Sequence, residues 1–298
     1  MHLLKDGSFQ DLDRLVKDGN VIAGPPVEAI NWGDIHIEEL DPMVASTCWG
    51  YDVEKRAIDG TSSMLDDLRP RHQFFHDSFD FKARMVFTRR DPHERHMRVV
   101  EKQNSVEDML DQVGRFLHLT RRDWCKSVHV ASNHNLFLEK WLKDVDGAGD
   151  PSNALVWHEL NAAYHRAIRE GDFKFSPHAF AIQNRAHDLG DIAFLAEAES
   201  YAICQTTQPI ECGLHGHNGP RGARGSASNL AKLVERVNTG HTHEPRILEG
   251  AYIAGTSSTL DMAYAIRGPL AWHHSQIVTY QSGKRTIVTL SNGKYHAP

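Results

Sequence analysis

Five short apolar runs along the chain each lead into residues that commonly bind metal ions. The runs end at "GDIHIE", "FHDSFD", "SNHN", "LHGH" and "GHTH", spread over residues 33–243. The carboxyl ends of parallel strands share one edge of a sheet, so side chains far apart in sequence can meet there. Alternate side chains of an extended segment also point the same way, so both members of an Asp-x-His or His-x-His pair can reach one site. The pattern predicts an α/β protein with a polar cluster at a sheet edge.

Apolar periodicity supports alternating strands and helices over most of the chain. Strand patterns cover 27–34, 72–77, 126–134, 210–217 and 236–243. Helical patterns cover roughly 105–118, 135–144, 153–170, 187–199 and 226–235. Ser105 is the expected N-cap of the first helix. The tail reads as a meander of short strands with a hairpin at Ser282-Gly283, so we expect an α/β sandwich with sheets inside and helices outside.

Composition narrows the class of protein. No apolar stretch approaches the roughly 18 residues of a membrane span, and the start lacks the pattern of a secretion signal. The four cysteines form no CxxC pair, which is typical of reduced thiols in a cytoplasmic protein. A net charge of −6 excludes a uniformly basic surface but leaves room for a local basic channel. We therefore expect a cytoplasmic protein without a membrane partner.

The five motifs, taken in order, resemble those of the calcineurin-like metallophosphoesterase family, which read D-x-H, G-D, G-N-H-[DE], H and G-H-x-H. The resemblance spans roughly residues 27–290. It implies a four-layer α/β/β/α sandwich with two central mixed sheets. Two positions depart from the family pattern: His76 precedes Asp77 where the family has Gly, and Asn135 stands where the family has Asp or Glu.

A narrower resemblance concerns the segments "HGHNGPRGARGS", "GHTHEP" and "GTSSTLDMAYAIRGPLAWHHSQIVTYQSGKR". They look like a branch of tailed-phage proteins described as transferring or degrading DNA. This implies a location in the host cytoplasm. Residues 26–298 would form the metallophosphoesterase domain. Residues 1–25 would be a leading segment, or the end of a larger N-terminal region.

The family resemblance implies two divalent metal ions and their ligands. One ion would take Asp34, His36 and His243 together with Asp77. The other would take Asn133, His215 and His241, again with Asp77. Asp80 is the alternative bridging carboxylate. Nitrogen and oxygen ligands without a thiolate suit Mn²⁺, Zn²⁺ or Fe²⁺, with Mg²⁺ as a further alternative; we favour Mn²⁺.

The third motif supplies the implied catalytic residue, His134, which would protonate or stabilise the leaving oxygen. His76, Asn135 and His217 are expected to adjoin the ligands. His215 directly follows a strand and best fits the fourth-motif ligand. His217 has the same side-chain parity in an extended segment, so it is either a neighbour of the ligands or the alternative ligand.

The segment after this motif is rich in glycine and arginine. Arg221 and Arg224 in "GPRGARG" are candidates for contacting DNA phosphates. The alternative is a solvated turn without a partner. The neighbouring ligand motif favours the phosphate contact.

Three functions agree with these patterns. The first is a nuclease that hydrolyses DNA phosphodiester bonds through a metal-bridging hydroxide. The second is a phosphoesterase that acts on a nucleotide or other small phosphoester. The third is an inactive, metal-stabilised module that docks on DNA. DNA is the expected partner, and a homo-oligomer is a further expectation.

Overall fold

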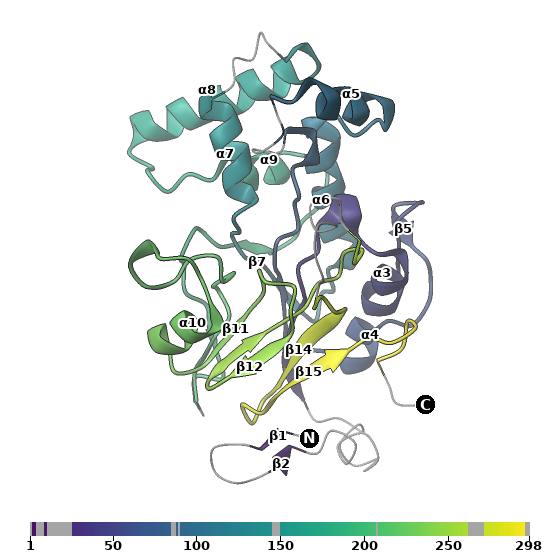
Figure 1. Cartoon of the computed structure of the whole chain (residues 1–298), viewed down its shortest axis with the longest axis vertical. Helices are drawn as coiled ribbons and strands as arrows, with labels where there is room; N and C mark the ends of the chain where they lie inside the picture. Colours follow the sequence, from purple (N-terminus) through teal and green to yellow (C-terminus); the bar gives the residue numbers. More distant parts are fainter. Residues whose placement is uncertain are drawn as a thin grey trace.

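The computed structural model describes residues 2–3, 9–10, 26–84, 88, 90–144, 150–206, 208–261 and 271–295. Two mixed sheets and eight α-helices lie in this part of the chain (Figure 1). The leading segment falls almost entirely outside the described residues, apart from the paired strands β1 (His2–Leu3) and β2 (Phe9–Gln10). Among the described helices, none has the length and apolarity needed to cross a bilayer.

The larger sheet has six strands in the order β15-β14-β3-β6-β7-β8. Its parallel members are β3 (Val27–Asn31), β6 (His72–Phe75), β7 (Lys126–His129) and β8 (Ala193–Phe194). The antiparallel strands β14 (Ser275–Tyr280) and β15 (Arg285–Thr289) complete it. Every residue of β3 is buried, as expected for a strand covered on both faces.

The second sheet has five strands in the order β12-β13-β11-β10-β9. They are β9 (Ala202–Ile203), β10 (Ile210–Glu211), β11 (Val237–Thr239), β12 (Arg246–Leu248) and β13 (Ala251–Ile253). The prediction of one C-terminal meander was wrong, because β12 and β13 join this sheet whereas β14 and β15 join the other. The predicted hairpin between β14 and β15 is present, with Gly283 at a φ of 80°. A separate small ribbon pairs β4 (Tyr51–Asp52) with β5 (Ala57–Ile58).

Apolar and polar contacts join the two sheets. Ala29, Phe74 and Val128 of the six-stranded sheet share a buried cluster with Ile203 and Ile210 of the other sheet. A buried amide, Nδ2 of Asn238, also donates to Oδ1 of Asn31 at 2.9 Å across this interface. The strands that carry the predicted motifs are therefore held against one another.

Some helices pack beside the sheets, and others lie together at one end of the molecule (Figure 1). They are α3 (Pro42–Trp49), α4 (Met64–Leu68), α5 (Pro92–Val100), α6 (Val106–Thr120), α7 (Asn135–Asp144), α8 (Ala154–Glu170), α9 (Pro177–Gln183) and α10 (Ala227–Leu233). Phe116 of α6 packs on Phe75 of β6, with ring centroids 5.8 Å apart. Leu230 of α10 packs on Val237 and Ala251 of the five-stranded sheet. Figure 1 shows α5, α7, α8 and α9 grouped at the top, beyond the sheets.

Most predicted helices occur, with one exception. Ser105 caps α6, since its hydroxyl accepts from the backbone N–H of Asp108 at 3.1 Å. The helix expected at 187–199 is wrong, because this segment holds turns and β8. The side chain of Asp188 accepts from the N–H of Gly190 at 2.9 Å, and such a local bond competes with helix formation.

Candidate metal centre

The predicted motifs meet where the two sheets adjoin. The turns after β3, β6 and β7 carry the first three motifs, and these strands are parallel neighbours. The segments after β10 and β11, also parallel, carry the last two. The strands themselves are shorter than expected, so every motif lies in a turn just past the strand end. The prediction that the motifs follow parallel strands and converge is confirmed.

One group of side chains combines Asp34, His36 and His243, all buried. The Nε2 atoms of His36 and His243 lie 3.1 Å apart. Oδ2 of Asp34 lies 3.0 Å from Nε2 of His243. Three donor atoms thus face one small volume.

A second group combines Asp34, Asp77 and His215. Nε2 of His215 lies 3.6 Å from Oδ2 of Asp77 and 3.1 Å from Oδ1 of Asn133. Nδ1 of the same ring lies 3.9 Å from Oδ1 of Asp34. His215 therefore joins the carboxylates of the other sheet.

Asp77 stands between the two groups. Its Oδ2 atom lies 3.7 Å from Nε2 of His36, besides the 3.6 Å to His215, and 3.1 Å from Nδ1 of His134. Its other oxygen, Oδ1, accepts a 2.6 Å hydrogen bond from the Ser132 hydroxyl. Ser132 was not singled out in the sequence, although it directly precedes the Asn-His pair of the third motif.

Asp80 lies behind His36 and His134 and forms a third group with them. Its Oδ1 atom is 3.3 Å from Nδ1 of His36 and 3.7 Å from Nδ1 of His134. The Asp80 carboxylate is fully buried. This position supports a role in orienting the two histidines, whereas Asp77 occupies the central position. The backbone N–H of Asp80 donates to the carboxylate of Glu38 at 2.8 Å, which holds the turn in place.

Several of these residues have an unusual backbone conformation. His36, Asp77, His241 and His243 all have positive φ angles, at 44°, 43°, 78° and 59°. Such angles are uncommon outside glycine and gather at functional sites. Gly240 is required for a related reason, since a Cβ there would lie 2.1 Å from Oδ1 of Asp34. The close approach lets the N–H of His241 donate to Asp34 at 2.9 Å.

Burial and charge divide the protonation states of the cluster. Burial lowers the pKa of His36, but the charge of Asp77 and the bond and charge of Asp80 outweigh it and raise that pKa to about 9. Burial similarly opposes protonation of His134, and Asp77 overcomes it, so the pKa of His134 is raised. Burial dominates at His215 and His241 and lowers both pKa values. The charges of His134 and His36 hold the pKa of Asp77 well below its usual range despite burial.

Other predicted residues lie around these groups. The ring of His241 is beside His215, with centroids 5.2 Å apart. His217 turns away, and its Nε2 atom lies 3.2 Å from Oε1 of Glu197. The ring of His76 stacks on the His215 ring, with centroids 5.9 Å apart, and its Nε2 atom lies 3.3 Å from Nδ2 of Asn31. His215, the favoured ligand of the fourth motif, is the histidine that faces Asp34 and Asp77.

Asn135 contacts Ser132 rather than His134. Its Oδ1 atom lies 3.1 Å from the Ser132 hydroxyl, which is closer to Asp77 at 2.6 Å. Asn135 therefore reaches the cluster only through that serine. Glu197, the partner of His217, carried no signal in the sequence, since it falls in the segment wrongly predicted as a helix.

The arginine loop lies after His215 and His217. Arg221 and Arg224 are both exposed, and Arg221 has a φ of 56°. Within the described residues, neither guanidinium pairs with a carboxylate. A Cβ on Gly225 would lie 1.7 Å from the carbonyl oxygen of Gly216, so the loop closes against its own start.

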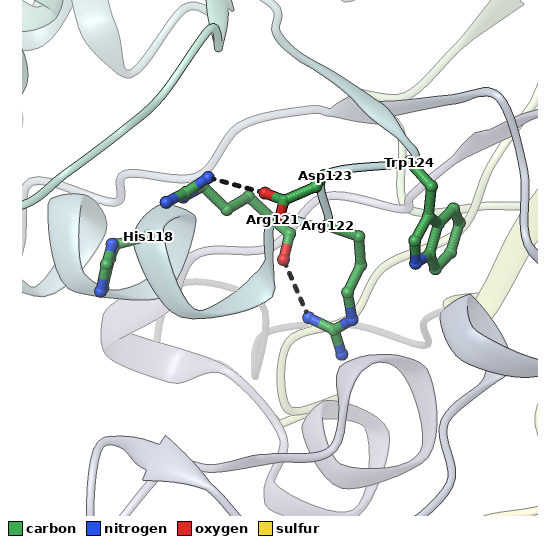
Figure 2. A pocket seen from close by; sticks show the side chains of 5 residues that line it. All are labelled: His118, Arg121, Arg122, Asp123 and Trp124. Atoms are coloured by element: carbon green, nitrogen blue, oxygen red, sulfur yellow. Dashed lines mark hydrogen bonds and ion pairs between the residues drawn. The ribbon is translucent and has the colours of Figure 1, made fainter.

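A different arginine-rich pocket lies far from the metal-type side chains. This open pocket measures about 320 Å³ and precedes the amino end of β7. Figure 2 shows the side chains that line it, His118, Arg121, Arg122, Asp123 and Trp124. Its arginines are engaged by carboxylates. Arg121 pairs with Asp188 at 2.7 Å and with Asp123 at 3.3 Å. Arg122 contacts both oxygens of Asp66, at 2.8 and 2.9 Å.

The donor set fits divalent cations. Buried atoms without a hydrogen-bond partner include Oδ2 of Asp80 and Nδ1 of His215 and His243. Unpaired buried polar atoms are costly, and a cation is one group that would satisfy such a set. All nearby donors are imidazole nitrogen or carboxyl and amide oxygen, and no thiolate takes part. The groups can therefore hold metal ions.

Comparison with known proteins shows similarity to a protein of a bacteriophage. The chain is 37% identical over 273 residues to "Protein A1" of Escherichia phage T5, a match that covers 91% of this chain. The chain spans about half the length of that relative, since the match covers 47% of it. No family model matches the chain. The similarity is thus to a phage protein.

Proposed function

We propose that this protein is a metal-dependent phosphodiesterase that hydrolyses DNA, with the fold and motif roles of the calcineurin-like metallophosphoesterases. The position of Asp77 carries the proposal. One of its oxygens faces His36, His215 and His134 at 3.7, 3.6 and 3.1 Å. A carboxylate between two histidine-lined groups is what a site for two neighbouring cations requires. Helices on the outer faces of two packed sheets support the four-layer arrangement.

The two groups would hold the two cations as the motifs imply. One would be held by Asp34, His36, His243 and Asp77, and the other by Asn133, His215, His241 and Asp77. When bound, two divalent cations neutralise phosphate oxygens and make water a nucleophile near neutral pH. Histidine with carboxylate and amide oxygen favours Mn²⁺ among the candidates.

His134 would act on the leaving oxygen. Its Nδ1 atom faces Asp77 and Asp80, which leaves Nε2 for the substrate. Burial lowers the pKa of His134, but the charge of Asp77 outweighs it and raises that pKa, which favours the protonated ring that can donate a proton to the departing alkoxide. Asp80 supplies a negative charge near His134, which Asn135 cannot supply. Asp80 would therefore take the place of the acidic residue that the family motif has at the position of Asn135.

DNA is the favoured substrate because two exposed cations, Arg221 and Arg224, lie on the loop that follows His215. Phosphate oxygens of a bound strand are natural partners for such side chains. A nucleotide or other small phosphoester is the second candidate, favoured by the net charge of −6. The similarity to a phage protein supports the narrower phage branch.

The test is cleavage of linear and closed-circular DNA by the purified chain with Mn²⁺. EDTA and Asp77→Ala are the controls. Metal-dependent loss of both substrates indicates an endonuclease, and loss of the linear form alone indicates an exonuclease. Cleavage that survives EDTA or Asp77→Ala overturns the proposal. Turnover of nucleotides with intact DNA favours the second candidate.

A further inference from the structure

A second cavity adjoins the metal-type cluster. It measures about 290 Å³ and lies between the start of α7, the segment 173–177 that leads into α9, and the segment 195–197 after β8. This volume is near the lower end of the roughly 300–1,000 Å³ typical of small-molecule sites. It is large enough for one planar group of nucleobase size.

Two lining residues connect the cavity to the cluster. Ser132 lines it and donates to Oδ1 of Asp77 at 2.6 Å. Glu197 lines it from another side and contacts Nε2 of His217 at 3.2 Å. A phosphodiester held near Asp77 and His134 would therefore place an attached nucleoside at the cavity.

The cavity carries an exposed aromatic side chain. Phe173 is 83% exposed, more than any other large apolar side chain in the described part of the chain. Phe175 forms another part of the wall and is fixed by Tyr164 and Phe180, with ring centroids 5.7 and 5.3 Å away. Exposed aromatic faces are the usual stacking platforms for unpaired bases.

The polar groups of the wall suit a nucleotide as well. Lys174, exposed between the two phenylalanines, can contact a phosphate. The carboxylate of Glu139 accepts from the Tyr164 hydroxyl at 3.1 Å and lies 3.4 Å from Nζ of Lys143. That partner cation offsets its charge, so Glu139 does not make the wall strongly repulsive to an anionic ligand. Asn135 offers an amide that can bond a base edge.

We propose that this cavity binds an unpaired nucleobase next to the scissile phosphate, stacked on Phe173, with Lys174 on a neighbouring phosphate. The inference rests on the proposed function and deepens it. A base inside a continuous duplex cannot enter such a cavity without leaving the stack. The favoured substrates are then single strands, frayed ends and gaps.

The test compares Phe173→Ala and Lys174→Ala with wild type. Leu155→Ala is the matched control, because Leu155 is 67% exposed and does not line the cavity. The first readout is fluorescence anisotropy of a labelled phosphorothioate oligothymidylate with Mn²⁺ present, which tests the metal-bound protein with a strand that resists hydrolysis. The second is the KM for thymidine 5′- and 3′-p-nitrophenyl phosphates, set against bis(p-nitrophenyl) phosphate.

Phe173→Ala should weaken oligothymidylate binding about tenfold, in keeping with the loss of one stacked base. It should raise the KM for at least one thymidine ester similarly and leave bis(p-nitrophenyl) phosphate unaffected. Lys174→Ala should lower the affinity for the oligonucleotide and reduce the slope of log affinity against log salt. Leu155→Ala should behave as wild type, and a blunt hairpin duplex should bind less tightly than the single strand.

The two proposals fail in different ways. Wild-type binding of oligothymidylate that depends on Phe173, without hydrolysis of any ester, supports the cavity and overturns the hydrolase. Metal-dependent hydrolysis with oligonucleotide binding unchanged in Phe173→Ala supports the hydrolase and overturns the cavity. The cavity proposal is also overturned if the wild-type protein does not bind oligothymidylate. It is likewise overturned if Phe173→Ala weakens the binding of a peptide or of duplex DNA as much as the binding of oligothymidylate.

Discussion

The Nε2 atoms of His36 and His243 face each other at 3.1 Å in the protein interior. Two imidazole nitrogens at this distance need a proton or a cation between them, and both rings come from turns at positive φ. The carboxylate of Asp34 lies on the same side, at 3.0 Å from His243. This arrangement of donors is the basis of the predictions that follow.

Asp77→Asn should lower the metal content of the protein. The wild type should hold two cations per chain after loading with Mn²⁺, and the variant one or fewer, because the shared oxygen loses its charge. Phosphodiesterase turnover should fall by roughly 10²-fold or more, since a catalytic cation contributes several kcal/mol. Metal analysis after gel filtration measures the content. Asp123→Asn, which alters an exposed carboxylate, should keep both ions.

The loss of turnover caused by His134→Gln should depend on the leaving group of the substrate. Protonation of an alkoxide contributes about 10²–10⁴-fold, whereas p-nitrophenolate leaves without a proton. Cleavage of DNA should therefore fall by that factor and turnover of bis(p-nitrophenyl) phosphate much less, with the metal content unchanged. Equal losses on both substrates would argue against proton donation by His134.

Metal affinity should rise with pH. The pKa of His36 is raised to about 9, and metal binding needs the neutral ring. Each pH unit between about 7 and 9 should strengthen binding up to tenfold. Equilibrium dialysis against Mn²⁺ across this range measures the slope, and His36→Gln should flatten it. A slope of zero in the wild type would contradict the assignment.

The raised pKa of His36 makes metal binding stronger as the pH rises, but it should make the metal-free protein less stable over the same range. A group whose folded pKa is raised stabilises the fold below its unfolded pKa, near 6.5, and loses that contribution as pH rises through the folded value. With EDTA, the free energy of unfolding should therefore decline from about pH 6.5 to about 9. Urea titrations of wild type and His36→Gln at several pH values compare the two.

The paired change Arg221→Ala and Arg224→Ala should weaken DNA binding and leave the turnover of bis(p-nitrophenyl) phosphate unchanged. Each lost phosphate contact should reduce the slope of log affinity against log salt by about one. Arg95→Ala is the control, since Arg95 is exposed on α5 and lines neither the loop nor the proposed cavity. An unchanged salt slope would favour the solvated-turn interpretation.

Trp272 should report metal binding at His243. Its ring lies at 4.3 Å from the His243 ring, centroid to centroid, in a T-shaped contact. Mn²⁺ titration should change tryptophan fluorescence in the wild type, and Trp272→Phe should remove most of that change while retaining the metal. A signal that persists in Trp272→Phe would place its origin at another tryptophan.

The strand ends could be predicted because the convergence of parallel strands depends only on strand order and direction. The position of His215 directly after a strand favours it over His217 as a ligand, but the spacing does not predict that the two rings separate. Equal parity assumes an extended chain, but Gly216 has a φ of 108°, and the two rings diverge toward Asp77 and Glu197. The spacing of residues along the chain does not predict this orientation of the two rings, because it depends on distant parts of the fold.

The same limit applies to Asp80 and to the segment 187–199. Asp80 follows Asp77 by three residues, and only the turn between them decides which carboxylate is central. Leu189, Ile192 and Leu195 repeat every three residues, as in a helix, and all three are buried. Here the Asp188 turn overrides that periodicity, and the apolar side chains reach the core from turns and a short strand.

The cluster draws its side chains from both sheets. Asp34, His36 and Asp77 follow strands of the six-stranded sheet, whereas His215 and His243 follow strands of the other. Any cation held among them would therefore add a cross-link between the two sheets, beside the hydrogen bond from Asn238 to Asn31. Removal of the metal by a chelator would first loosen the contact between the two sheets. The turns after β10 and β11 should then become sensitive to proteolysis as metal is lost, before the rest of the fold unfolds.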